Sequence, residues 1–158
     1  MLTKPKKKTK KPKAPSLSSL KEKVWQEFSL FIRLRDAKRF EELFPESHNT
    51  VECVTCKKPY PATGVGCAQA GHFIPGRKNA YLFDERQVRA QCYNCNLRLK
   101  GNWPPYLEYM EDMFGKEAVD HMRLVQRYEI VSFTHDELIE KRAYYKTKVT
   151  ELKEQLCL

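Results

Sequence analysis

Apolar and polar residues follow one another with helical periodicity near the start of the chain. Large apolar side chains recur about three or four positions apart over this stretch: Leu20, Val24, Phe28, Phe31 and Ile32. This is the spacing of one face of an α-helix. Ser19 followed three residues later by Glu22 is a capping-box pattern, and Pro45 disfavours helical backbone in the residue before it. The pattern therefore predicts a helix from about Leu20 to Phe44.

The middle of the chain, from Val51 to Arg89, has no such periodicity. It breaks into short apolar pieces separated by prolines and glycines: Pro59, Pro61, Gly64, Gly66, Gly71, Pro75 and Gly76. Residues of this kind favour turns and hairpins. The stretch from Cys92 to Lys100 is typical of the first turns of a helix, closed by Gly101.

Helical spacing returns in the last third of the chain. We expect one helix over Leu107 to Phe114 and a second over Lys116 to Tyr128. A third helix is expected to begin at Thr134, because Thr134 and Glu137 form another capping box. The apolar positions of this third helix are Leu138, Tyr145, Val149 and Leu152. The pattern as a whole predicts an α+β fold in which helices flank a central, mostly non-helical core.

Positive charge is gathered in two places. The formal net charge is +9; Met1 to Lys13 contains seven lysines and no acid, and Glu52 to Asn102 holds eight Lys or Arg against three acids, so that the remaining segments together are acidic. Clustered positive charge suits a polyanion such as a nucleic acid. For the lysine run alone, a solubilising disordered tail is the alternative.

The length and the order of these segments predict one domain with tails. A chain of 158 residues is long enough for one compact core. We expect a disordered basic arm over residues 1–15, an N-terminal helical segment over 16–50, a metal-binding core over 51–102 and a C-terminal helical region over 103–158. The basic start runs into prolines and serines instead of an apolar stretch, so we expect no signal peptide, no membrane span and a cytoplasmic location.

A pair of Cys-x-x-Cys motifs gives the most specific chemical signal. Cys53 and Cys56 form the first motif, and Cys92 and Cys95 form the second. In a chain without a secretory signal, such pairs indicate metal or redox chemistry and not a disulfide framework. Two pairs complete a tetrahedron in which protein fills all four positions around Zn²⁺. We therefore predict a structural zinc site; buried free cysteines or a redox pair are the alternative.

Between the two motifs lies a histidine in a setting that suits hydrolysis. The segment reads Gly71-His72-Phe73, and Asn96 directly follows the second motif. An imidazole can accept a proton near neutral pH, as phosphodiester hydrolysis requires. An amide oxygen is a ligand that Mg²⁺ accepts. His72 is therefore a candidate general base, and Asn96 a candidate ligand of a catalytic Mg²⁺ or Mn²⁺ ion. A structural histidine, or one that replaces a zinc cysteine, is the alternative for His72.

This order of motifs resembles the HNH, or ββα-metal, nucleases, and in particular the subset with four zinc cysteines. Over nearly the whole chain the pattern is similar to the NinG (Rap) family of phage recombination proteins. The similarity rests on Phe31-Ile32-Arg33-Leu34-Arg35-Asp36, the first cysteine motif, Gly71-His72, Gln91-Cys92-Tyr93-Asn94-Cys95-Asn96 and Gly101-Asn102.

The resemblance implies a ββα-metal, HNH-like core that is stabilised by zinc and flanked by N- and C-terminal helices. It also implies a metal-dependent, structure-selective DNA endonuclease acting on branched recombination intermediates such as Holliday junctions and D-loops, in the host cell cytoplasm. A zinc-dependent DNA-binding module without catalysis is the alternative, and a second alternative is a protein-interaction zinc domain, which would not explain the basic centre. Cutting a four-way junction symmetrically calls for two active sites, so a homodimer is a reasonable expectation.

The chain departs from the HNH pattern at two positions. These nucleases commonly carry an acidic or histidine metal ligand just before the base, where this chain has Gly71. Gln87 stands where the family often has the Asn that braces the hairpin loop. Asp84 is our candidate for the missing ligand, and Glu85 is the alternative.

The remaining candidates are basic and aromatic residues. Expected phosphate contacts come from the arm and the core: Lys4, Lys6, Lys7, Lys8, Arg77, Lys78, Arg89, Arg98 and Lys100. Trp25 and Trp103 are expected in the hydrophobic core, because they occur at helical spacing or beside helix starts.

Overall fold

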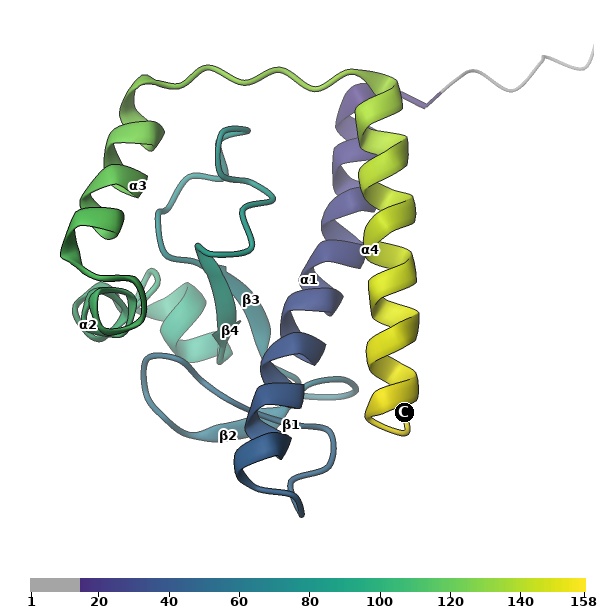
Figure 1. Cartoon of the computed structure of the whole chain (residues 1–158), viewed down its shortest axis with the longest axis vertical. Helices are drawn as coiled ribbons and strands as arrows, with labels where there is room; N and C mark the ends of the chain where they lie inside the picture. Colours follow the sequence, from purple (N-terminus) through teal and green to yellow (C-terminus); the bar gives the residue numbers. More distant parts are fainter. Residues whose placement is uncertain (1–14) are drawn as a thin grey trace, which may run out of the picture.

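The computed structural model describes residues 15–158 (Figure 1). The basic arm predicted over residues 1–15, with its phosphate contacts Lys4, Lys6, Lys7 and Lys8, lies outside the described residues except for Pro15. The described elements are, in chain order, α1 (Leu17–Leu43), β1 (Thr50–Glu52), β2 (Pro59–Pro61), β3 (Gln69–His72), β4 (Val88–Gln91), the π-helix η1 (Asn94–Arg98), α2 (Trp103–Phe114), α3 (Lys116–Tyr128) and α4 (His135–Gln155). The α+β class is confirmed.

The two capping boxes predicted from the sequence have different outcomes. At the start of α1 the side chain of Ser16 accepts a hydrogen bond from the Ser19 amide at 3.2 Å, so Ser16 is the N-cap and the box of Ser19 with Glu22 is wrong. At the start of α4 the box is confirmed. Thr134 Oγ1 accepts the Glu137 amide at 3.2 Å, and the Glu137 carboxylate accepts the Thr134 amide at 2.7 Å.

The central segment forms two short antiparallel hairpins. In the first, β1 pairs with β2 and Val51 lies opposite Tyr60. In the second, β3 pairs with β4 and His72 lies opposite Val88. The π-helix η1 follows the second hairpin almost at once, so this part of the chain has the order strand, strand, helix.

Helix α1 lies between the second hairpin and α4 and packs against both. α1 and α4 lie side by side and run in the same direction (Figure 1). Buried residues of α1, including Val24 and Phe28, join Val88 and Ala90 of β4 and Leu138 of α4 in one hydrophobic core. Burying each large apolar side chain stabilises the fold by roughly 1.5–3 kcal/mol. This core therefore fixes α1 over one face of the hairpin.

A second hydrophobic core holds α2 and α3 against the other side of the hairpin. Its buried residues come from the segments after β1 and β3 and from both helices: Val54, Phe73, Ile74, Tyr81, Tyr106, Met110, Val119 and Met122. The hydroxyl of Tyr106 on α2 donates to the carbonyl oxygen of Gly71 at 2.9 Å. On β3, Ala70 therefore packs in the core with α1, whereas the backbone of the next residue, Gly71, bonds to α2.

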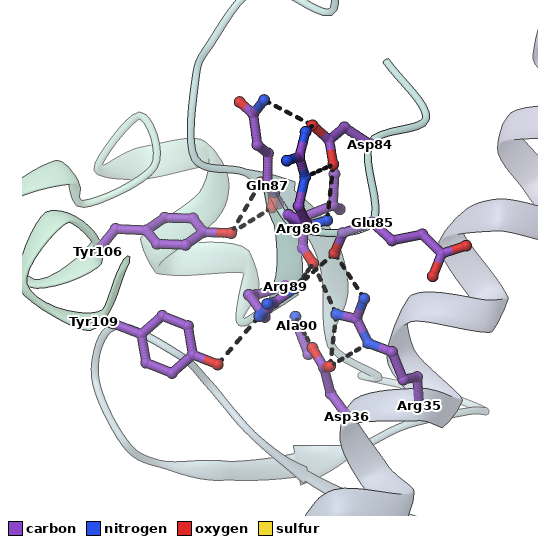
Figure 2. A network of polar contacts seen from close by, with 12 residues as sticks. Arg35, Asp36, Asp84, Glu85, Arg86, Gln87, Arg89, Ala90, Tyr106 and Tyr109 are labelled. Atoms are coloured by element: carbon purple, nitrogen blue, oxygen red, sulfur yellow. Dashed lines mark hydrogen bonds and ion pairs between the residues drawn. The ribbon is translucent and has the colours of Figure 1, made fainter. Parts of the chain in front are cut away.

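Polar bonds between α1 and β4 complete this packing (Figure 2). The Asp36 carboxylate accepts the Ala90 amide at 2.8 Å, and the Arg35 guanidinium donates to the carbonyl oxygens of Glu85 at 2.8 Å and Val88 at 2.9 Å. Arg35 and Asp36 also pair with each other at 2.8 Å. These contacts give hydrogen-bond partners to backbone N–H and C=O groups that remain unpaired at the edge of a two-stranded hairpin. In the described part of the chain, no helix is both long and apolar enough to cross a bilayer.

Candidate functional site

The four cysteines of the two motifs come together as one cluster. The sulfur atoms of Cys53, Cys56, Cys92 and Cys95 all lie within 4.8 Å of one another, and those of Cys56 and Cys92 are 3.9 Å apart. Zinc–sulfur bonds of about 2.3 Å in a tetrahedron place the sulfurs about 3.8 Å apart. Three of the four side chains are buried. The spacing and the donor set therefore fit a structural Zn²⁺ ion.

Local backbone geometry makes each motif a tight turn around its sulfurs. After β1 the chain reverses at Lys57, whose φ of 60° lets its amide donate to the Cys53 carbonyl at 2.9 Å. In the second motif the Cys95 amide donates to Cys92 Sγ at 3.4 Å. The two motifs are also linked, because the Cys92 amide donates to Cys53 Sγ at 3.3 Å. Such N–H···S bonds stabilise negative charge on the sulfurs.

The pKa values of the thiols agree with a site built for a cation. Burial acts to raise the pKa of Cys53, but hydrogen bonds from Thr55 and from backbone amides bring that pKa down to about 6. Burial and the neighbouring Cys53 raise the pKa of Cys56 to about 12, and burial raises the pKa of Cys95. One ionised sulfur thus opposes ionisation of the others. A divalent cation would remove that opposition.

A basic cleft of about 600 Å³ opens between α1, β3 and η1. We call it the His72 cleft, and its lining residues are Trp25, Ser29, Arg33, Cys67, Ala68, Gln69, Ala70, His72, Pro75, Gly76, Arg77, Asn96, Leu97, Lys100 and Gly101. Three of these carry positive charge, and none of these described lining residues is Asp or Glu. The two candidate catalytic residues, His72 and Asn96, therefore line the same cleft.

His72 is held in one orientation by three neighbours. Its Nε2 lies 3.1 Å from the carbonyl oxygen of Leu82, and because a carbonyl only accepts, Nε2 carries the proton of this bond. The Trp25 ring stacks on the imidazole, with centroids 5.0 Å apart and an interplanar angle of 16°, and Tyr81 meets it edge-on at 6.1 Å. Nδ1 of the neutral ring is therefore the nitrogen with a free lone pair.

The surroundings of His72 favour its neutral form. Burial lowers the pKa of His72, the positive charge of Arg77 lowers it further, and the hydrogen bond to Leu82 opposes them without reversing the shift. Since the ordinary pKa of histidine is about 6.5, the ring is neutral near neutral pH, with its one proton on Nε2. Its Nδ1 can then accept a proton.

Asn96 lies on η1 with its amide group fixed. The Nδ2 group donates to the Oε1 of Gln69 on β3 at 2.8 Å. This bond uses the nitrogen of the Asn96 amide and leaves its oxygen for another partner. η1 is a π-helix, a geometry that often occurs at functional sites.

A side chain at the position before His72 would require Gln91 to shift. A Cβ at Gly71 would collide with Oε1 of Gln91 and would lie 2.8 Å from its Cδ. Gln91 is itself buried, with Nε2 donating to the Gly101 carbonyl at 2.8 Å. Gly71 also occupies the face of β3 that is opposite to His72. A larger residue at position 71 would therefore be accommodated only with a change in the packing of Gln91.

Asp84 does not line the His72 cleft. Its carboxylate accepts hydrogen bonds from the Arg86 side chain at 2.8 and 3.0 Å and from Gln87 Nε2 at 3.0 Å (Figure 2). Burial acts to raise the pKa of Asp84, but the hydrogen bonds from Arg86 hold it below its ordinary value. The bonds that Gln87 makes to Asp84, from its Nε2 and from its backbone amide, both at 3.0 Å, stabilise the loop before β4.

The basic residues predicted as phosphate contacts separate into two groups. Arg77, Lys78, Arg98 and Lys100 are exposed. Arg89 is only 3% exposed, and its guanidinium donates to the carbonyl oxygens of Glu85 and Val88 at 2.7 and 2.8 Å (Figure 2). Arg89 therefore stabilises the hairpin instead of facing a phosphate, which corrects the sequence-based expectation.

The sequence pattern missed three residues of the cleft. Trp25 and Trp103 were both expected in the core, yet Trp25 is half-buried against His72 and Trp103 is 39% exposed. Arg33 lines the cleft, where it donates to the carbonyl oxygen of Ala62 at 2.8 Å. Gln69, which holds Asn96, had no sequence signal. The apolar period of α1 could not separate Trp25 from its buried neighbours, because Trp25 directly follows Val24.

Comparisons with known proteins identify relatives of this chain. A family model described as Bacteriophage Lambda NinG protein matches residues 2–155. Protein ninG of Escherichia phage 933W and Protein ninG of Enterobacteria phage VT2-Sa are each 28% identical over 109 residues, which is 68% of this chain and 51% of the relative. The chain therefore aligns with about half the length of these relatives. No solved structure matches it.

Proposed function

The chain belongs to the NinG family of phage proteins, and from that premise we propose that it is a metal-dependent DNA endonuclease whose active site is the His72 cleft. One observation carries the proposal: a neutral, fixed imidazole shares a basic cleft with the Asn96 amide. A ring with a free nitrogen is what activation of water requires. Three cations around it suit a phosphate.

In this proposal His72 Nδ1 takes the proton from the water that attacks phosphorus. The hydrogen bond from Nε2 to Leu82 supports the role, because it selects the tautomer in which Nδ1 is unprotonated. Proton transfer of this kind contributes about 10² to 10⁴ in rate. Trp25 acts through His72 as a positioning residue, since stacking at 5.0 Å limits rotation of the imidazole.

Charge on the phosphate would be balanced by Arg33, Arg77 and Lys100, which line the same cleft. The Arg77 guanidinium lies 4.4 Å from the centre of the Trp25 ring, and its nearest carboxylate, that of Glu22, is 4.0 Å away. So long an ion pair between half-exposed side chains is weak. Arg77 is therefore free to turn toward a bound phosphate.

A catalytic Mg²⁺ or Mn²⁺ ion would use Asn96 as its protein ligand. Mg²⁺ commonly keeps several waters and binds substrate phosphates together with few protein groups, and the absence of a carboxylate among the described lining residues makes the substrate's oxygens the main anionic ligands. Such an ion would stabilise charge on the phosphate and on the leaving oxygen. Zinc would stay in the cysteine cluster, where its four positions are filled and it cannot activate water.

We further propose branched recombination intermediates, such as Holliday junctions and D-loops, as the substrates. The family resemblance supports this, and so does the basic cleft. A homodimer would supply the two active sites that symmetric cutting of a junction needs.

The alternative function is a zinc-dependent DNA-binding module without catalysis. The observation in its favour is the missing acidic ligand, since Gly71 is blocked by Gln91 and Asp84 is held by Arg86. The zinc cluster and the basic surface serve both functions equally.

A nicking assay separates the two functions. Zinc-loaded protein is mixed with a labelled synthetic four-way junction, with Mg²⁺, with Mn²⁺ or with a chelator too weak to remove zinc, and binding is measured in parallel. The endonuclease reading expects strand cleavage only with the added ion. Tight binding of the junction with no cleavage under any condition would instead support the DNA-binding module without catalysis.

A further inference from the structure

A second basic cleft of about 540 Å³ adjoins the His72 cleft and has no assigned role. Its lining residues are Lys78, Asp120, Arg123, Leu124, Gln126 and Arg127. All but Lys78 lie on α3, and we call it the α3 cleft. Three cations face a single acid, so the cleft presents net positive charge.

The cations of α3 form a stripe along one side of the helix. Lys116, Asp120, Arg123 and Arg127 follow one another at four, three and four positions, the spacing of one helical face. Asp120 pairs with Lys116 at 3.0 Å and with Arg123 at 3.6 Å. Arg127 has no ion-pair partner within residues 15–158. One carboxylate shared by two cations leaves the stripe positive.

Arg123 is already ordered for binding. Its guanidinium carbon lies 5.7 Å from the centre of the Trp103 ring, and Trp103 is stacked on the buried Phe73 with centroids 6.2 Å apart. A cation held over a ring loses less side-chain freedom when it meets a ligand. The ring also shields one side of the guanidinium and leaves its N–H groups at the surface.

Adjacent residues connect the two clefts. Arg77 lines the His72 cleft and reaches Trp25 on α1, whereas Lys78 lines the α3 cleft, with Nζ 3.5 Å from the Gln126 carbonyl oxygen. Their loop lies between α1 and α3 in Figure 1. Arg77 and Lys78 thus place two adjacent positive charges where the two clefts meet.

We propose that the α3 cleft is a second nucleic-acid contact surface, on which a duplex arm of the substrate lies after it leaves the His72 cleft. This rests on the proposed function only in taking DNA as the ligand of the His72 cleft. The stripe from Lys116 to Arg127 is about 16 Å long at 1.5 Å per residue. Laid along a duplex, that length spans about five base pairs at about 3.4 Å each. Guanidinium groups suit phosphates because their N–H groups bind in pairs.

The test compares two double variants of the full-length, zinc-loaded protein. Arg123→Gln with Arg127→Gln removes the two guanidinium groups of the α3 cleft. Arg142→Gln with Lys146→Gln is the matched control, because it removes two exposed cations at the same four-residue spacing on α4. Binding to a synthetic junction is followed by fluorescence anisotropy over a range of salt concentrations, and circular dichroism with zinc analysis verifies the fold.

The α3 variant is expected to bind at least about tenfold more weakly at low salt, with a slope of log affinity against log salt that is shallower by about 1.8, since each lost phosphate contact is worth about 0.9. The α4 control should match the wild type.

An unchanged slope for the α3 variant, or an equal loss in the α4 control, would overturn the proposal. Its failure is distinguishable from failure of the endonuclease reading. If the wild type never cleaves but the salt slopes of the α3 variant and the wild type differ as expected, the α3 cleft binds DNA and the endonuclease proposal is wrong. If the wild type cleaves but the two salt slopes agree, the endonuclease proposal is supported and the α3 proposal is wrong.

Discussion

Gly71→Ala tests the packing that keeps a side chain out of the position before His72. The new Cβ would collide with Gln91 Oε1 and lie 2.8 Å from Cδ and 3.1 Å from Cγ. Gln91 cannot move without losing the bonds from its Nε2 to the Gly101 carbonyl at 2.8 Å and to Thr55 Oγ1 at 3.3 Å. Those bonds contribute about 0.5–1.5 kcal/mol each.

Overpacking in a filled core adds about 1–3 kcal/mol, and the lower chain entropy of Ala relative to Gly returns about 0.4–1 kcal/mol. We therefore expect Gly71→Ala to lower the free energy of unfolding by about 2–4 kcal/mol, out of the 5–15 kcal/mol or so typical of a domain. The midpoint of thermal unfolding should fall by about 5–15 °C.

Urea unfolding of zinc-loaded protein, followed by circular dichroism, measures the change. The same substitution is then made in a Gln91→Ala background, where the colliding atoms are gone, and the two effects are compared as a double-mutant cycle. The cost of Gly71→Ala should shrink by at least about 1 kcal/mol there. A loss below about 0.5 kcal/mol in the wild-type background, or strict additivity in the cycle, would refute the steric reasoning.

Three further predictions concern the zinc cluster, the base and the arm. Cys92→Ser opens the cysteine tetrahedron, so zinc content, folded fraction and DNA binding should fall together, whereas wild-type protein should contain about one zinc per chain by metal analysis. Arg77→Gln removes a positive charge that lowers the pKa of His72, so the acid limb of the rate–pH profile should move to higher pH than in the wild type. An acid limb at the same pH in both proteins would contradict this. Deleting Met1 to Lys13 should weaken binding for all DNA sequences alike and flatten the salt slope, and an unchanged slope would make the arm a solubility tail.

The parts of the fold that follow local rules could be predicted from the sequence. Prolines, glycines and apolar spacing located the helices to within a few residues, and the duplicated Cys-x-x-Cys spacing located the cysteine cluster. The N-cap was missed at Ser16, because Ser16 and Ser19 both precede an apolar run and only the backbone geometry selects between them.

The residues that were missed depend on packing between segments far apart in the chain. Arg89 resembles any basic residue in the sequence, yet it is buried because the carbonyl oxygens of Glu85 and Val88 turn toward it. Trp25 faces His72 because α1 crosses the second hairpin at that point. The pairing of Gln69 with Asn96 joins residues 27 positions apart. The spacing of residues along the chain does not predict such long-range contacts.

The most direct test of the account is the single-turnover cleavage rate of His72→Ala on a synthetic junction with Mg²⁺ or Mn²⁺. The substitution removes the proposed base and leaves the cysteine cluster and the basic surface in place, so zinc content and junction affinity should stay within a few-fold of wild type. The cleavage rate of His72→Ala should fall by a factor of at least about 10². The cleavage rate of Asn96→Ala should also fall, and this variant should need a higher Mg²⁺ concentration. Cleavage by His72→Ala at the wild-type rate would contradict the account, and loss of zinc and fold in this variant would identify His72 as a structural residue instead.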